Sequence, residues 1–94
     1  EKVAYLFSRH KMVSAVTFDG KRHVLDFTLE SLEEQLSPDM FFRANRQFMV
    51  NIEGVLKVHT FFNGKLLLET EPSFDEKVTI SRTKAPQFKL WLDR

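Results

Sequence analysis

Three short segments of this sequence combine basic and amide side chains at positions where an apolar run stops. They are Arg9-His10-Lys11, Arg43-Ala44-Asn45-Arg46-Gln47 and Ser81-Arg82-Thr83-Lys84. An arginine guanidinium can bind the O6 and N7 edge of guanine, and Asn or Gln side chains can pair with adenine. Lysine, threonine, serine and glutamine can hold phosphate oxygens. The chemistry these segments offer is recognition of a nucleic acid, although charged loops commonly serve only solubility, and composition alone favours that second interpretation.

No other group of residues supports catalysis or metal binding. The histidines lack the spacing of a zinc motif, and His59 is expected to be an ordinary strand residue. The glycines are isolated, so no phosphate-binding loop is predicted, and Ser81 has no histidine near it in sequence to act as its base. The acidic pairs Glu33-Glu34 and Glu69/Glu71 are typical of solvated surfaces. We therefore expect no enzyme, no cofactor and no metal.

The composition is that of one soluble domain. The chain has 94 residues, 43% hydrophobic and 29% charged, which is enough for one core and excludes disordered and low-complexity classes. No apolar run is long enough to cross a membrane, so we expect no direct membrane contact. The absence of cysteine fits a reducing compartment, and a cytoplasmic location is expected. The net charge of +1 conceals segregation, because residues 29–39 carry only negative charges and residues 77–92 only positive ones.

The first part of the chain predicts an antiparallel meander and a helix. Residues 3–7 are apolar or aromatic at every position, which indicates a strand buried on both faces. Residues 12–18 and 22–27 predict two further strands, joined by a hairpin turn at Asp19-Gly20-Lys21 because Asp-Gly tolerates positive φ. A short helix is expected over residues 29–36, where leucines recur at helical spacing and Thr28 can cap the first turn.

The rest of the chain predicts short strands and a last helix. The strands are apolar or alternating runs at 40–42, 48–51, 55–62 and 65–70 as a hairpin around Asn63-Gly64, and 77–80. The polar bend 43–47 should face solvent, since burying its charges would be costly. Asn51 should satisfy backbone groups. Thr83 could cap a helix over residues 84–92, with Pro86 tolerated in its first turn.

The polar bend lies within a longer motif. Residues 41–51 are Phe-Phe-Arg-Ala-Asn-Arg-Gln-Phe-Met-Val-Asn, which resembles the central signature of the LytTR family, Phe-x-Arg-x-His/Asn-Arg-Ser/Gln-aromatic-x-Val-Asn. Further features agree in order: Leu29-Glu30-Ser31-Leu32-Glu33 is similar to the family's Leu-x-x-Leu-Glu helix, Asn63-Gly64-Lys65-Leu66 to its second hairpin, and Ile80-Ser81-Arg82 to its Val-Ser-Arg element. The resemblance covers nearly the whole chain.

LytTR domains are DNA-binding output modules of bacterial response regulators. The resemblance implies a mostly β fold of small, stacked antiparallel sheets with one or two short helices, forming one domain over residues 1–94. It also implies that loops enter the major groove of paired direct repeats in double-stranded promoter DNA. An upstream receiver or sensor domain is expected, with dimerisation on DNA through it. The family usually has a further strand before the position where this sequence begins, so a first strand is expected upstream of residue 1.

The resemblance also assigns roles to individual residues. Arg46 and Arg82 match base-contacting positions, and the loop Ser8–Met12 matches a third contact region. Asn45 stands where the family often has histidine. The candidate base contacts are Arg46, Arg82, His10, Lys11 and Asn45. The candidate phosphate contacts are Arg9, Arg22, Gln47, Thr83 and Lys84.

A second interpretation stays open. The chain could be a protein-interaction domain in the same kind of regulator that has lost its affinity for DNA. The salt dependence of duplex binding separates the two possibilities, because a protein that neutralises phosphates releases counterions.

Overall fold

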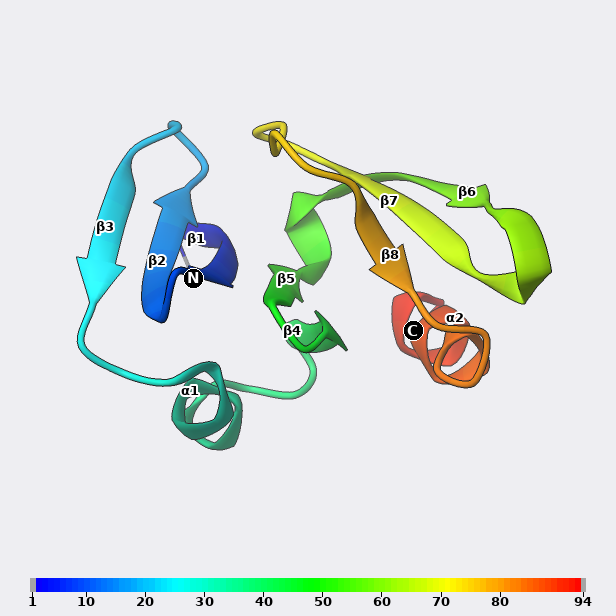
Figure 1. The fold of residues 1–94 in the computed structure, drawn as a ribbon, viewed down its shortest axis with the longest axis horizontal. Coiled ribbons are helices and arrows are strands. Elements are labelled where there is room, and N and C mark those ends of the chain that lie inside the picture. Colours follow the sequence, from blue (N-terminus) through cyan, green and yellow to red (C-terminus); the bar gives the residue numbers. More distant parts are fainter. Residues whose placement is uncertain (1, 94) are drawn as a thin grey trace.

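The computed structural model describes residues 2–93, which form eight strands and two short α-helices. One sheet has the order β3 (Arg22–Leu25), β2 (Met12–Thr17), β1 (Val3–Arg9), β5 (Phe48–Asn51), β4 (Phe41–Asn45). The other has the order β6 (Val55–Thr60), β7 (Leu66–Thr70), β8 (Val78–Ile80), and every neighbouring pair is antiparallel. Figure 1 shows α1 (Leu29–Gln35) beside the first sheet and α2 (Ala85–Leu92) beside the second. The expected mostly β fold is confirmed.

Strand β1 is buried on both faces, as its continuous apolar run predicts. Tyr5 and Phe7 belong to the larger core cluster, together with Phe88 of α2 and residues of the second sheet. Successive side chains of a strand point to opposite faces, so Leu6 lies on the other side, in a smaller cluster with Leu29 of α1. The five-stranded sheet is therefore a middle layer, with α1 on one face and the second sheet and α2 on the other.

The β1–β2 turn is tighter than the sequence predicts. β1 continues to Arg9, which pairs with Met12, instead of stopping at Phe7. Only His10 and Lys11 remain in the turn, with φ of 54° and 64°. Positive φ at both central residues suits the twist of a two-residue hairpin, although it is uncommon for residues that carry a side chain.

Helix α1 begins where its capping residue predicts. The Oγ1 atom of Thr28 accepts a hydrogen bond from the backbone N–H of Ser31 at 3.0 Å. Leu29 and Leu32 are buried against the sheet. The exposed face of the helix carries Glu30 and Glu33, so α1 presents acidic side chains at the edge of the first sheet.

The start of helix α2 corrects one prediction. Thr83 was expected to cap this helix, but the N-cap is Lys84, and Thr83 is exposed. The chain turns directly after β8, and Ser81 stabilises this turn: its Oγ accepts from the backbone N–H of Lys84 at 3.2 Å, and its carbonyl accepts from the backbone N–H of Ala85 at 2.9 Å. Pro86 lies in the first turn, as predicted.

Asn51 has the structural role that the sequence predicts. Its side chain is fully buried. Its Nδ2 donates to the carbonyl of Val3 at 2.9 Å, and its Oδ1 accepts from the backbone N–H of Glu53 at 2.9 Å. The residue thus ties the end of β5 to the beginning of β1, which neither strand could do with backbone groups alone.

The loop between β7 and β8 is fastened to the first sheet by aromatic and ionic contacts. The ring of Phe74 packs on Tyr5 and Phe7, with centroid distances of 5.6 and 4.8 Å. The guanidinium of Arg9 donates to Asp75 at 2.8 Å and lies 3.0 Å from Glu76. The hydrogen bond from Arg9 holds the pKa of Asp75 below its ordinary value.

Replacing Phe88 tests the core between the sheets. This ring is fully buried and contacts Phe42 and Trp91. Phe88→Ala is expected to lower the free energy of unfolding by about 3–5 kcal/mol, because a large cavity cannot be refilled. Leu90→Ala, in the same helix but 75% exposed, is the control and should change stability by less than about 0.5 kcal/mol. Urea denaturation followed by circular dichroism measures both, and equal losses would contradict the packing described.

The Arg9–Asp75 pair predicts a pH dependence of stability. The pKa of Asp75 is lowered in the folded chain by the hydrogen bond from Arg9, so its stabilising effect is present at neutral pH and is lost as the pH falls through the folded pKa. The difference in thermal midpoint between the unaltered chain and Asp75→Asn should therefore be largest near neutrality and disappear in acid. Glu34→Gln, at an exposed position of α1, is the control. A difference that grows on acidification would contradict the sign.

Candidate nucleic-acid interface

Two turns and one strand meet at one end of the first sheet. β1 pairs antiparallel with β5, with Phe7 opposite Phe48, so the β1–β2 turn and the β4–β5 turn lie at the same end. The backbone N–H of Ser8 donates to the carbonyl of Gln47 at 2.9 Å across this junction. Strand β8 lies alongside, because the Nδ2 of Asn45 donates to the carbonyl of Thr79 at 2.9 Å.

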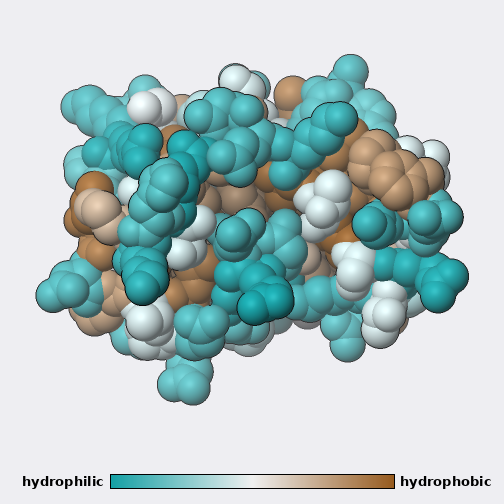
Figure 2. Space-filling view, in the orientation of Figure 1, coloured by the Kyte–Doolittle hydropathy of each residue, from teal (hydrophilic) through white to brown (hydrophobic). Residues whose placement is uncertain are grey.

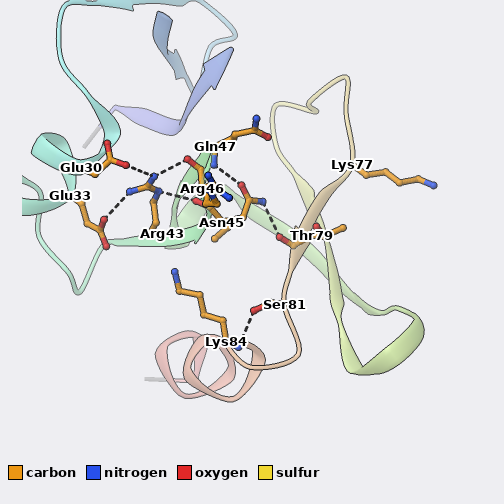
Figure 3. A pocket seen from close by; sticks show the side chains of 11 residues that line it. Glu30, Glu33, Arg43, Asn45, Arg46, Gln47, Lys77, Thr79, Ser81 and Lys84 are labelled. Atoms are coloured by element: carbon orange, nitrogen blue, oxygen red, sulfur yellow. Dashed lines mark hydrogen bonds and ion pairs between the residues drawn. The ribbon is translucent and has the colours of Figure 1, made fainter. Parts of the chain in front are cut away.

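Two adjoining open clefts lie over this junction. The larger, of about 1140 Å³, is lined by residues of α1, β4, the β4–β5 turn and β8, and Figure 3 shows its side chains. The smaller, of about 290 Å³, extends towards the β1–β2 turn, and both clefts include Asn45, Gln47 and Lys77. We call the surface formed by His10, Arg46, Gln47, Lys77 and Lys84 around these clefts the basic surface.

Arg43 is the structural centre of the larger cleft, which corrects its expected place in a solvent-facing bend. β4 extends through Asn45, and only 10% of the Arg43 side chain is exposed. Its guanidinium donates to the carbonyls of Asn45 and Arg46, each at 2.8 Å. It also pairs with Glu33 at 2.9 Å and Glu30 at 3.3 Å (Figure 3). The planar fork of arginine can satisfy all four acceptors at once.

The acidic residues of α1 are exposed, as predicted for Glu33-Glu34, and two of them also pair with Arg43. The pKa of Glu30 is lowered, first by a hydrogen bond from its own backbone N–H and then by Arg43. Glu69 and Glu71 are exposed as well, and Glu69 lies 2.6 Å from the Nε2 of His59. His59 is a strand residue facing a neighbour, as expected.

Arg46 occupies the two-residue turn between β4 and β5, and its side chain is exposed. Its carbonyl is held by Arg43, but within residues 2–93 no hydrogen bond or ion pair holds its guanidinium. Gln47, beside it in the turn, is exposed as well. The backbone of this turn is therefore fixed while the charge of Arg46 stays available.

Asn45 differs from Arg46 in that its amide is used inside the protein. Besides the bond to Thr79, its Oδ1 accepts from the backbone N–H of Gln47 at 2.8 Å. One side chain thus joins the two sheets and closes the β4–β5 turn. The structure places Asn45 at the base of the cleft, half-buried, below the exposed Arg46.

The two residues of the β1–β2 turn contribute to different surfaces. His10 lines the smaller cleft and faces the basic surface. Lys11 lines a separate depression with Met12, Val24 and Phe27, on the side of β3. The structure therefore separates His10 from Lys11, which the sequence proposed together as base contacts. Of the two, only His10 lines a cleft with Gln47.

Arg9 and Arg22 are engaged with the protein itself. The guanidinium of Arg9 pairs with Asp75 and Glu76 and lies 5.0 Å from the ring centroid of Phe7. That of Arg22 lies 5.0 Å from the same ring, and its Nε donates to the Oγ of Ser14 at 3.4 Å. Both arginines stack on one aromatic ring, at the margin of the basic surface.

The segment after β8 carries the remaining candidates. Arg82 and Thr83 are exposed, in the turn that leads from β8 into α2. Lys84 lines the larger cleft, and its ammonium lies 5.5 Å from the ring centroid of Phe42. Lys77, directly before β8, is a member of the basic surface that sequence reasoning did not select. Its place in the all-positive run 77–92 was the available signal.

Metal and membrane sites receive no support from the described part of the chain. Within residues 2–93, no three histidine, aspartate or glutamate side chains are grouped as metal ligands. No helix in the same range is long and apolar enough to cross a membrane.

Known proteins resemble this chain over nearly its whole length. Residues 1–93 match the model of the LytTr DNA-binding domain family. The chain is 26% identical over 85 residues to the transcriptional regulatory protein YpdB of Escherichia coli, covering 90% of this chain and 34% of that protein. It is 31% identical over 87 residues to the sensory transduction protein LytT of Bacillus subtilis, covering 93% and 35%.

The fold agrees as well. A solved LytTr DNA-binding domain from Bacillus cereus superposes with a TM-score of 0.83 at 25% identity, covering 99% of this chain and 83% of that one. The chain spans about a third of the length of the curated relatives it matches. With a family model that accounts for residues 1–93 and a matching fold, the chain belongs to the LytTR DNA-binding domain family.

Proposed function

We propose that this domain binds double-stranded promoter DNA in a sequence-specific manner, as the output module of a bacterial transcription regulator in the cytoplasm. The observation that carries the proposal is the junction of the β1–β2 turn, the β4–β5 turn and β8, which gathers His10, Arg46 and Lys84 on one basic surface. An exposed, unpaired guanidinium on a turn whose backbone is fixed is suited to a base edge, because only the side chain has to be ordered on binding.

The dimensions of the domain support contact through loops along one side of a duplex. The longest extent is 34 Å, close to the roughly 34–36 Å of one helical turn of B-DNA. Turns a few residues wide can enter a major groove about 12 Å across, whereas neither short helix carries the candidate base contacts. We therefore propose that turns, and not a helix, contact the bases.

The candidate residues divide into two roles. We propose Arg46, Arg82 and His10 as the principal base contacts, with Asn45 and Lys11 beside them. Gln47, Thr83 and Lys84 are proposed to hold phosphates, to which the exposed Lys77 adds a further charge. Arg9 and Arg22 would contribute less to phosphate binding, because Arg9 is already paired with two carboxylates and both stack on Phe7.

A single domain of this size offers a small interface, on the order of 600–1,000 Å². We propose that two domains occupy paired direct repeats, tethered through an upstream receiver or sensor domain that dimerises. Tethering raises the effective concentration of the second domain, so the pair binds better than either domain alone.

A protein-interaction role is the alternative, and one observation favours it. Met12, Val24 and Phe27 are each more than half exposed, beside edge strand β3. Figure 2 shows apolar side chains reaching the surface over β3 at one end and over the β6–β7 hairpin at the other. Duplex affinity with a steep salt dependence favours the DNA-binding role, and binding without such a slope favours the alternative.

Substitutions of the proposed DNA contacts should differ in kind. Arg46→Ala or Arg82→Ala is expected to cost about 1–3 kcal/mol at the cognate duplex and to relax preference at one base position. Lys84→Ala should weaken binding to all duplexes alike and lower the salt slope by about one, since lysine acts as a point charge. Fluorescence anisotropy with selected and scrambled duplexes at several salt concentrations measures both effects. Lys89→Ala, at an exposed position of α2, is the control. If Arg82→Ala loses the same affinity for both duplexes, Arg82 contacts the phosphate backbone of the DNA and not a base.

Arg43 should affect DNA binding without touching DNA. Arg43→Lys keeps the charge but removes the fork that holds the carbonyls of Asn45 and Arg46. We expect faster hydrogen exchange at the backbone amide of Gln47 and about tenfold weaker binding to the selected duplex. Glu30→Gln should have a much smaller effect, because exposed ion pairs contribute little. Unchanged exchange and affinity in Arg43→Lys would show that the turn does not depend on it.

A further inference from the structure

The β6–β7 turn lies against the segment that carries Arg82. Leu66 pairs with Ile80, so the turn preceding β7 and the residues following β8 are neighbours. The turn is a short 3₁₀ segment, Phe62–Gly64, in which Asn63 and Gly64 have φ of 59° and 76°. It is therefore a compact loop whose backbone faces the base of the Arg82 side chain.

Because Gly64 has no side chain, the side chain of Arg82 can lie directly against the backbone of the turn. A Cβ at residue 64 would lie 2.8 Å from the Cγ and 2.9 Å from the Cδ of Arg82. Real Cβ atoms essentially never approach other atoms so closely, so any side chain at residue 64 would force Arg82 to move. Gly20 offers the contrast: its φ is 87°, but a Cβ there would meet nothing within 4 Å. Glycine at residue 64 is thus favoured by its φ, and its lack of a Cβ leaves the stem of Arg82 in place.

We infer that Gly64 is a positioning residue for the base recognition assigned above to Arg82, an inference that rests on the proposed function. The bare backbone of the β6–β7 turn seats the aliphatic stem of Arg82 and so limits where its guanidinium can lie. An exposed arginine with a free stem would distribute over many rotamers, whereas a stem confined on one side has fewer to lose on binding. The second hairpin contributes to sequence preference without supplying a side chain to the bases.

The test compares Gly64→Ala with Gly20→Ala in the 94-residue chain. Both substitutions place alanine at positive φ in a hairpin turn, so the backbone strain is matched, and only residue 64 adjoins Arg82. The probe is the best duplex that the unaltered chain selects from a randomised pool, with a scrambled duplex beside it. Nuclear magnetic resonance of the Arg82 Nε–Hε group, assigned with Arg82→Lys, reports the side-chain position without DNA.

The expected result is specific to residue 64. Gly64→Ala should shift the Arg82 Nε–Hε resonance and lower the ratio of scrambled to selected Kd by about tenfold, within the range for one base contact. Gly20→Ala should change neither, while both variants lose similar thermal stability. In an Arg82→Ala background, Gly64→Ala should lower the ratio no further, because the residue it positions is gone.

Other outcomes overturn the inference in distinguishable ways. If Arg82→Ala lowers the ratio but Gly64→Ala behaves like Gly20→Ala, the positioning role is wrong and the proposed role of Arg82 stands. If Arg82→Ala leaves the ratio unchanged, both are wrong. A loss that persists in the double variant would assign the effect of residue 64 to something other than Arg82. Should Gly64→Ala fail to fold, Gly64→Asn with Gly20→Asn takes its place under the same criteria, since asparagine tolerates positive φ and retains the Cβ.

Discussion

The pairing of β1 with β5 in the middle of the five-stranded sheet determines where everything else can lie. These strands are distant in sequence, and both are buried on both faces, by α1 on one side and by the second sheet and α2 on the other. A register slip by one residue would exchange the two faces and move rings such as Phe7 and Phe48 out of the larger cluster, onto the side packed by α1. The register therefore fixes which ends of the strands coincide, and with them the proximity of His10 to Gln47.

Arginine serves two opposite purposes around this junction. Arg43 and Arg9 are saturated by carbonyls or carboxylates, and they hold turns and loops in place. Arg46 and Arg82 are exposed at positions where the backbone around them is fixed by other groups. An arginine held by several internal acceptors can fix the position of a turn or loop. An exposed arginine without such partners keeps its charge available for an external anion. The same residue type thus supplies both the support and the contact.

Much of the fold could be predicted from local sequence, and the site only in part. The cap at Thr28, the Asn63-Gly64 turn and the two-sided burial of residues 3–7 depend on neighbours in sequence, and the structure agrees with each. One failed prediction depends on contacts between segments. Arg43 was assigned to solvent because its carboxylate partners lie on helix α1, ten and thirteen residues away from its own strand. The cap expected at Thr83 failed for a local reason, since the chain turns directly after β8 and the Oγ of Ser81 accepts from the backbone N–H of Lys84.

The contrast between Asn45 and Arg46 has an evolutionary consequence. Substitution at residue 45 would break the bond to Thr79 and the closure of the turn, so it would be constrained by folding. Substitution at residue 46 would disturb no contact of its side chain within residues 2–93. Any selection that keeps arginine at residue 46 must therefore come from what its side chain binds outside the domain, and not from the stability of the fold.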